Sequence, residues 1–371
     1  MLDTQTAPSP PTVADEQADF ASFHTSNFPA LLETLKTTLV VSTYQAGKLI
    51  FLRNDCGRLN THFRHFDSPM GVAYDPATRA LAVGTRHQIW TFRDHPRVAD
   101  KLDLPGRHDA VFLPRSVHFS GNIHVHEIGW IDGNVWAVNT RFSCLSTFDD
   151  HSSFVPQWRP PFVSAYAAED RCHLNGMAIH NGRVALATFL ARTDTPDGWR
   201  KHKINGGCLW DVVDDRLLAA GLCMPHSPRY YDGRIWFLES GIGSISTLDE
   251  SRAVAVEVVR LPGFTRGLCF VGHYAFVGLS QIRESAIFGG IPIAESDQKR
   301  CCGVWVVDVR NGTVAAFVRF EGAVQEIFAV EALTNLCFPE LVNEPGAILE
   351  SSFVLPPSVL REAATASDEP A

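Results

Sequence analysis

The sequence has no excess of positive charge, no long apolar run and no signal-like start, and each absence narrows the possible functions. Its formal net charge is -9, so it lacks the general basic field that binding to nucleic acid or to an anionic membrane surface requires. No run of about 18 apolar residues is present to span a bilayer. The stretch Met1–Pro11 has neither the cationic start nor the apolar core of a secretory signal. We therefore expect no nucleic-acid partner, no membrane partner and a cytoplasmic location.

Several motifs with known chemistry are also missing. The nine cysteines are scattered and form no Cys-x-x-Cys pair, which favours free thiols in a reducing compartment over a disulfide framework. The sequence contains no Gly-x-Gly-x-x-Gly or Walker loop, no Gly-x-Ser-x-Gly elbow and no His-Glu-x-x-His helix. Nucleotide-dependent, serine-hydrolase and zincin chemistry therefore have no support.

The sequence does contain a repeated plan of one polar residue, a strand, a tight turn and a second strand. The clearest copy is His126–Arg141. The same plan recurs in Met70–Thr85, Asn175–Thr188, His226–Ser240 and Arg266–Leu279, and a sixth inner strand, Gln325–Val330, starts the same way but has no second strand after it. Radial repetition of four-stranded sheets at a period of about 50 residues is typical of a β-propeller.

The first and last repeats are incomplete in complementary ways. Leu39–Thr43 resembles the second strands of the other repeats, so the opening unit lacks an inner strand, which Gln325–Val330 would supply. We therefore predict an all-β fold, a six-bladed β-propeller closed by pairing the C-terminal inner strand with N-terminal strands. Residues 26–356 form its single domain, and composition predicts disordered tails over 1–25 and 357–371. The long insertions Phe189–Gly207 and Ser280–Arg300 are expected to be lids over the rim where the inner strands begin.

Polar residues occupy equivalent positions in these repeats. Residues two apart on a strand share a face, so the same rim should collect the inner-strand starts, the residues two positions before them and the ends of the second strands. The starts are Met70, His126, Asn175, His226, Arg266 or its neighbour Thr265, and Gln325; the earlier positions add Ser68, His124, His173 and Met224; the second strands add Asn139 and Glu239.

Four histidines from three consecutive repeats indicate a metal centre at this rim. Neutral imidazole is a good ligand for first-row transition metals, so we expect His126, His173 and His226 to bind iron, copper or zinc. Glu239 is expected to act as the fourth ligand or as a base, and His124 as an alternate ligand or a support. The competing interpretation is that the histidines line a wet channel and bond to loop carbonyls.

Further polar residues near this rim are candidates for substrate binding. Arginine binds carboxylate or phosphate in two-pronged fashion, so Arg141 and Arg283 are predicted to clamp an acidic group; surface or inter-blade salt bridges are the alternative. The predicted supporting or substrate-contacting set is Asn139, Asn175, Arg266, Gln325 and Glu326.

Several motifs resemble those of a bacterial conserved-hypothetical family of unknown function. The resemblance covers about residues 25–345, and the motifs include Asn139–Cys144, Trp158–Phe162, Glu169–Gly176, His226–Arg229, Leu261–Gly267, Arg283–Ser285 and Gln325–Phe328. It implies membership but no activity. The architecture is also similar to six-bladed propellers of the gluconolactonase and strictosidine synthase type. Those gluconolactonase-like enzymes hold a divalent ion with carboxylate and Asn ligands, from which the histidine-rich ring departs.

These observations lead to one functional expectation and one alternative. We expect a metal-dependent enzyme, an oxidoreductase, lyase or hydrolase, that acts on a small or peptide-like substrate with an acidic group. The alternative is a non-catalytic propeller that binds a partner protein or ligand through the same rim. The sequence gives no oligomeric state.

Overall fold

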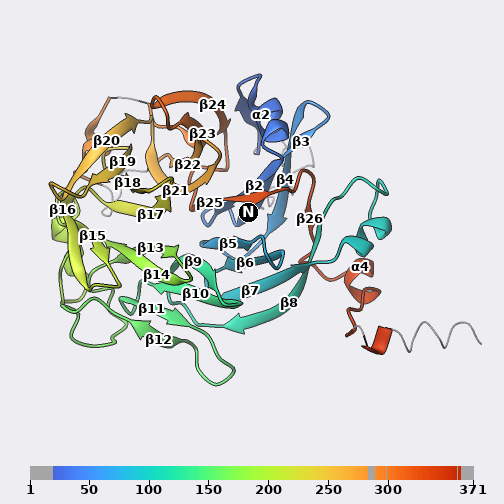
Figure 1. The fold of residues 1–371 in the computed structure, drawn as a ribbon, viewed down its shortest axis with the longest axis horizontal. Coiled ribbons are helices and arrows are strands. Elements are labelled where there is room, and N and C mark those ends of the chain that lie inside the picture. The colour runs from blue at the N-terminus through green and yellow to red at the C-terminus, as the bar shows by residue number, and fades with distance from the viewer. Residues whose placement is uncertain (1–19, 283–288, 298, 357, 361–371) are drawn as a thin grey trace, which may run out of the picture.

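Six small sheets arranged in a ring form a six-bladed β-propeller, as predicted (Figure 1). The computed structural model describes residues 20–282, 289–297, 299–356 and 358–360. The predicted tails 1–25 and 357–371 and residue Arg283 fall wholly or largely outside these ranges. None of the described helices is both long and apolar enough to cross a bilayer.

Each blade contains four consecutive antiparallel strands, numbered outward from the channel. Blade 1 holds β25 (Ala329–Thr334), β2 (Thr37–Thr43), β3 (Lys48–Asp55) and β4 (Arg58–His65). Blade 2 holds β5 (Val72–Asp75), β6 (Ala80–Gly84), β7 (Gln88–Asp94) and β8 (Val111–Phe119). Blade 3 holds β9 (Val125–Ile131), β10 (Asn134–Asn139), β11 (Cys144–Thr147) and β12 (Val155–Trp158).

The other three blades follow the same order. Blade 4 holds β13 (Leu174–His180), β14 (Arg183–Phe189), β15 (Gly207–Asp211) and β16 (Arg216–Leu222). Blade 5 holds β17 (Pro225–Tyr231), β18 (Arg234–Glu239), β19 (Ser244–Asp249) and β20 (Val254–Arg260). Blade 6 holds β21 (Phe264–Val271), β22 (Tyr274–Ser280), β23 (Cys302–Asp308) and β24 (Thr313–Phe320).

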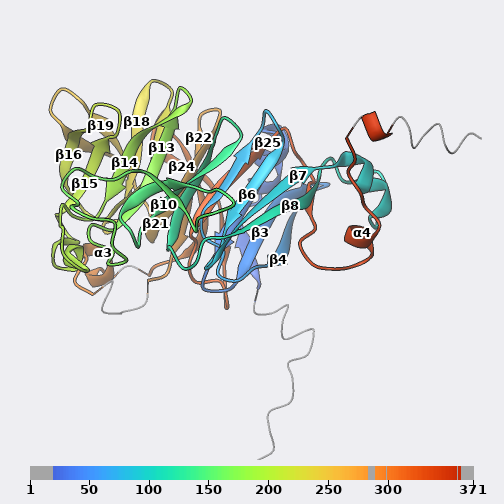
Figure 2. The same cartoon turned by 90° about the horizontal axis from the view of Figure 1, so that it is seen from below.

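Short helices lie outside the blades. They are α2 (Phe28–Thr34), α3 (Pro292–Glu295), α4 (Ala347–Glu350) and the 3-10 helices Pro96–Lys101 and Gly198–His202. Phe28 and Leu32 bury α2 against the core between blades 1 and 6. Figure 2 shows α3 at one face of the ring and α4 at its outer edge.

Tight turns join each inner strand to the second strand of its blade. In the Asp132–Gly133 turn both residues have positive φ, 49° and 76°. Asn181–Gly182 and Asp232–Gly233 repeat this conformation. Two successive positive φ values define the hairpin turn that matches the right-handed twist of paired strands, and Asp-Gly and Asn-Gly adopt it most readily.

The ring closes as the sequence predicts, but the closing strand lies further along the chain. β25 pairs with β2 over Thr37–Ser42 and Ala329–Thr334, whereas Gln325–Val330 was the expected strand. Before β25 the chain follows side-chain hydroxyls instead of a ladder. The Ile327 amide donates to Ser280 Oγ at 2.9 Å and the Ala329 amide donates to Ser42 Oγ at 3.0 Å.

Serine and threonine hydroxyls at the ends of second strands fasten one blade to the next. Each donates to a carbonyl at or just before the start of the next inner strand. The bonds are Ser42 Oγ to Met70 O (2.5 Å), Thr140 Oγ1 to Leu174 O (2.6 Å), Ser240 Oγ to Thr265 O (2.5 Å) and Ser280 Oγ to Ile327 O (3.1 Å). We call these bonds the hydroxyl latches.

Two elements near the chain ends add strands that the sequence did not specify. β1 (Ser22–His24) lies within the stretch 1–25 predicted to be disordered, yet it pairs with the edge strand β24. The prediction failed there because the exposed edge of blade 6 supplies backbone partners that composition does not reveal. β26 (Glu340–Leu341) pairs in parallel with β8 at the edge of blade 2.

The predicted lid segments lie between the second and third strands of blades 4 and 6. Trp199 from the first and Ile291 and Ile293 from the second are buried in one apolar cluster. Met224 and Phe264, from the starts of blades 5 and 6, complete that cluster. The described parts of the two insertions therefore pack together where the inner strands begin.

Glu340 anchors the segment that follows the closing strand. Its carboxylate contacts His62 Nε2 at 2.8 Å and Arg64 Nη2 at 2.7 Å, and Arg53 Nη1 lies 3.7 Å away. Burial alone would raise the pKa of Glu340, but the hydrogen bond and charge of His62 and the guanidinium of Arg64 lower it to about 2.

We expect Glu340→Gln to lower the free energy of unfolding at pH 7 by about 3 kcal/mol, because it leaves buried cations without their anion. The folded pKa is depressed, so the contribution is complete above the unfolded pKa of about 4.3 and is lost as the pH falls toward 2. Urea unfolding at several pH values measures both effects. Glu344→Gln, the same change at an exposed position nearby, is the control. Equal stability of Glu340→Gln and wild type at pH 7 would contradict this assignment.

Candidate functional site

The inner strands converge on a small cavity at the end of the channel where they begin. Its volume is about 20 Å³, which is room for about one water molecule. Each blade contributes one residue at or next to its inner-strand start: Gly71, His126, Asn175, His226, Arg266 and Phe328. The sequence placed four of these correctly. In blade 2 Gly71 takes the place predicted for Met70, and in blade 1 Phe328 takes the place predicted for Gln325.

Backbones approach one another closely around this cavity. A Cβ atom on Gly267 would lie 2.6 Å from the Val330 amide nitrogen, and Gly267 has a φ of 79°. Both features require glycine directly after Arg266. This glycine therefore lets blade 6 place Arg266 against the closing strand.

His126 is held through Nδ1. This atom lies 3.0 Å from His124 O and 2.8 Å from Thr140 Oγ1. The Thr140 hydroxyl hydrogen is used in its latch to Leu174 O, so Oγ1 offers a lone pair. Both neighbours therefore accept, Nδ1 carries the hydrogen, and Nε2 keeps a free lone pair.

His226 repeats this arrangement in blade 5. Its Nδ1 lies 3.0 Å from Met224 O and 2.8 Å from Ser240 Oγ. The Ser240 hydrogen is used in the latch to Thr265 O. His226 is therefore fixed in the same tautomer as His126, with Nε2 as an acceptor.

His173 is held by a carboxylate instead. Its Nδ1 lies 2.7 Å from Asp170 Oδ2, and Trp199 Nε1 donates to the same oxygen at 3.1 Å. The rings of His173 and Trp199 are 4.3 Å apart, and those of His173 and His126 are 4.9 Å apart. The first insertion thus reaches the histidine group through Trp199.

Left-handed backbone positions bring the chain into the inner strands. Ser68, His124, His173 and Met224 have φ values of 50° or 51°. These are the four positions expected two residues before the strand starts. At His124 and Met224 this conformation accompanies the carbonyl contacts to the histidines two residues later.

Arg266 supplies a cation at the cavity. Its guanidinium carbon lies 3.5 Å from the centre of the Phe328 ring. Nη2 is buried, and no described residue forms a hydrogen bond with it. Burial lowers the pKa of Arg266 to about 10, while Tyr44, Glu326 and Glu127 favour its charged form. Arg266 is therefore a cation at neutral pH with unused hydrogen-bonding capacity.

The cavity keeps two histidines neutral. Burial, followed by the charge of Arg266, lowers the pKa of His126 and of His226 well below the usual histidine value. Both imidazoles are neutral acceptors at neutral pH. The pKa of His124 is lowered by burial and by Arg141.

Two predicted site residues lie within the sheets and not at the cavity. The Glu239 carboxylate accepts from the Cys223 amide at 3.1 Å and from Ser246 Oγ at 3.2 Å, which are contacts within its own part of the ring. Asn139 Oδ1 accepts from the Phe142 amide at 3.1 Å. These contacts place neither side chain with the histidines.

The remaining predicted residues have mixed positions. Asn175 lines the cavity, and its Oδ1 accepts from Thr188 Oγ1 at 2.8 Å. Arg141 Nη2 lies 3.4 Å from His124 Nε2, outside the cavity lining. Gln325 Nε2 donates to Gly322 O at 3.4 Å, whereas Glu326 is close enough to favour the charge of Arg266. Arg283 lies outside the described residues.

The histidine group fits a metal ion only in part. Anchoring of Nδ1 by a carbonyl, hydroxyl or carboxylate is the usual support of a metal-ligating histidine, and His126, His173 and His226 all have it. Within the described ranges, however, no three His, Cys, Asp or Glu side chains are grouped closely enough to hold an ion.

Sequence reasoning missed Thr140, Ser240, Asp170, Trp199 and Phe328. For the two hydroxyls a signal was present, because a Ser or Thr follows both His126 and His226 at a spacing of 14. Trp199 lies in an insertion with no repeat equivalent. Phe328 was hidden by the misplaced start of the closing strand.

We expect Arg266→Met to raise the pKa values of His126 and His226, because the change removes a cation that lowers both. Burial remains, so both values should stay below that of a free histidine. NMR titration of the ring signals measures the shift, with His126→Gln and His226→Gln for assignment. Arg234→Met, at an exposed position, is the matched control. Unchanged values in Arg266→Met would show that the guanidinium does not act on these rings.

Comparison with known proteins identifies the fold and the family. A crystal structure of a nidogen/laminin complex is similar to this chain with a TM-score of 0.52 and 10% identity, covering 81% of this chain and 100% of that one. At this identity the likeness shows the propeller fold alone. No curated protein matches the chain. A family model described as "Domain of unknown function (DUF4915)" matches residues 26–342, which confirms the expected membership in a family of unknown function. The chain therefore belongs to the DUF4915 family.

Proposed function

We propose that this protein is an enzyme that binds the acidic group of a small substrate at Arg266 and moves a proton through His173. The observation that carries the proposal is the buried Nη2 of Arg266, which has no hydrogen-bond partner among the described residues and lies beside two anchored histidines. A buried cation with an unused donor favours an anionic ligand, because such a ligand restores the lost hydrogen bond and balances the charge.

The shape of the cavity limits what enters it. A volume of about 20 Å³ takes an oxygen of an acid group but not a whole substrate. The rest of the substrate would lie toward the rim, near Trp199 and the apolar cluster of the two insertions. The neutral Nε2 atoms of His126 and His226 favour a substrate that also carries a hydrogen-bond donor.

His173 is the best candidate for proton transfer. A carboxylate on Nδ1 orients the ring and stabilises the imidazolium that forms when Nε2 takes a proton. Only His173 of the three has this partner among its described contacts, at 2.7 Å from Asp170. His126 and His226 have neutral partners and lie near Arg266, which opposes their protonation.

The first test is anion binding. Formate, acetate and inorganic phosphate are titrated into the full chain, and ring signals of His126 and His226 are followed by NMR. We expect saturable shifts with the wild type and at least about tenfold weaker binding by Arg266→Met, since one charge-assisted hydrogen bond is lost. Arg234→Met should bind like the wild type. No saturable binding, or equal binding by Arg266→Met, would overturn the anion site.

His173→Gln separates binding from catalysis. It should bind the anion like the wild type but lose turnover of any substrate found by screening small acids. If acids bind but none is converted, the non-catalytic alternative is favoured: a propeller that binds its ligand through the same rim.

A metal-dependent version of this enzyme is the second candidate, because all three histidines have an anchored Nδ1. His126, His173 and His226 would hold iron, copper or zinc after small side-chain movements, and the ion would polarise the acidic group of the substrate. We keep a cytoplasmic location as part of the proposal, since scattered free thiols suit a reducing compartment.

We expect elemental analysis of the purified protein to find a stoichiometric transition metal if this version is correct. Cobalt(II) titration should give a visible absorption band that His126→Gln and His226→Gln remove. His180→Gln, at an exposed position on the far rim, should keep it. Absence of both the metal and the cobalt band would leave the metal-free version.

A further inference from the structure

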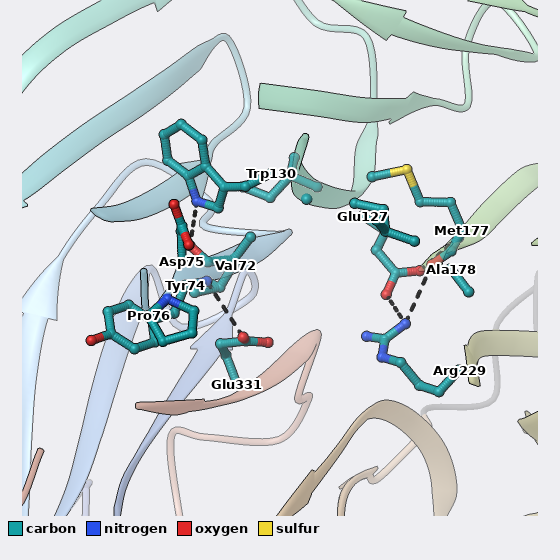
Figure 3. Close-up of a pocket in the computed structure, with 14 residues that line it drawn as sticks. Val72, Tyr74, Asp75, Pro76, Glu127, Trp130, Met177, Ala178, Arg229 and Glu331 are labelled. Atoms are coloured by element: carbon teal, nitrogen blue, oxygen red, sulfur yellow. Dashed lines mark hydrogen bonds and ion pairs between the residues drawn. The ribbon is translucent and has the colours of Figure 1, made fainter. Parts of the chain in front are cut away.

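The far end of the channel opens into a second, larger cavity. Its volume is about 320 Å³, and it is lined by residues of β5, β9, β13, β17 and β25 beyond their starts. Figure 3 shows Glu127, Arg229 and Glu331 reaching into it beside apolar side chains. This volume lies at the lower end of the range for small-molecule sites. We call it the far pocket.

One acidic group of the far pocket is already neutralised. Glu127 Oε1 lies 2.5 Å from Arg229 Nη1, and Glu127 Oε2 accepts from the Met177 amide at 2.9 Å. Arg229 also donates to Pro228 O at 2.8 Å. This pair borders both cavities, so it separates the histidine end from the far pocket.

Glu331 is the acidic group whose bonding is incomplete. Its Oε1 accepts one long hydrogen bond, from the Tyr74 amide at 3.4 Å. Within the described residues nothing donates to its other oxygen, which faces the pocket in Figure 3. Glu127 has already paired with Arg229, so the far pocket has one negative charge in excess.

We propose that the far pocket binds a small organic ammonium ion, with Glu331 as its counter-ion. An ammonium group would supply the hydrogen bonds and the positive charge that Glu331 lacks. Val72, Ile128 and Met177 line the pocket and offer apolar contact to the body of the ligand. The pocket has room for a ligand of about ten non-hydrogen atoms.

The protonation of Glu331 makes this binding depend on pH. Burial raises the pKa of Glu331 to about 7; Arg229 and the Tyr74 amide lower it, and Glu127 raises it. The carboxylate therefore forms as the pH rises through about 7. An amine that stays charged should bind more tightly at pH 8 than at pH 6, and its binding near pH 7 should release a proton.

Phenethylammonium is the probe, and phenethyl alcohol is its neutral counterpart. We expect calorimetry on the full chain to show saturable binding of the ammonium at pH 8, several-fold weaker binding at pH 6, and no comparable binding of the alcohol. Glu331→Gln should weaken binding about thirtyfold or more, because a buried charge pair is lost. Glu331→Asp, which keeps the charge, should weaken it less, and circular dichroism checks that both variants are folded.

Two outcomes would overturn the proposal: no saturable binding of phenethylammonium at pH 8, or equal binding by folded Glu331→Gln. Arg266→Met should bind the ammonium like the wild type, since its change lies at the other end of the channel. Glu331→Gln should likewise bind formate normally. The far pocket and the proposed anion site can therefore fail independently.

Discussion

The hydroxyl latches are the constraint on which the rest of the structure depends. A Ser or Thr at the end of a second strand donates to a carbonyl at the start of the next blade, as Ser240 does to Thr265 and Thr140 does to Leu174. The same two hydroxyls accept from His226 and His126. One small side chain therefore fixes the angle between blades and the tautomer of a histidine. Fold and site share these atoms, so a change in blade packing would be felt directly at the imidazoles.

Much of the fold was predictable because the repeat is written in local patterns. Asp132–Gly133 and its equivalents mark the hairpins, and the second-strand character of Leu39–Thr43 revealed that blade 1 needs its inner strand from the C-terminal part. The error at Gln325–Val330 has a physical cause: polar residues there imitate a strand start, while the backbone bonds to Ser280 and Ser42 hydroxyls. Hydrogen bonds to side chains far away in sequence leave no periodic signal.

The site was predictable only where it follows the repeat. His126, Asn175, His226 and Arg266 came from strand register alone, and all four line the cavity. Glu239 came from the same register, yet its carboxylate bonds to Cys223 and Ser246, because residue spacing sets the position of a Cα atom but not the direction of a long side chain. Asp170 and Trp199 lie outside the repeat, so no register argument could have found them.

Closure by β25 also has a consequence for how the protein is made. Thr37 and Leu333 are bonded across a separation of 296 residues, so blade 1 stays incomplete until almost the whole ring has been synthesised. The closing segment brings Phe328, under the Arg266 guanidinium, and Glu331, in the far pocket. Both ends of the channel are thus finished by the same late event. A nascent or partly opened ring has neither pocket complete, which couples ligand binding at either end to the intact circle of blades.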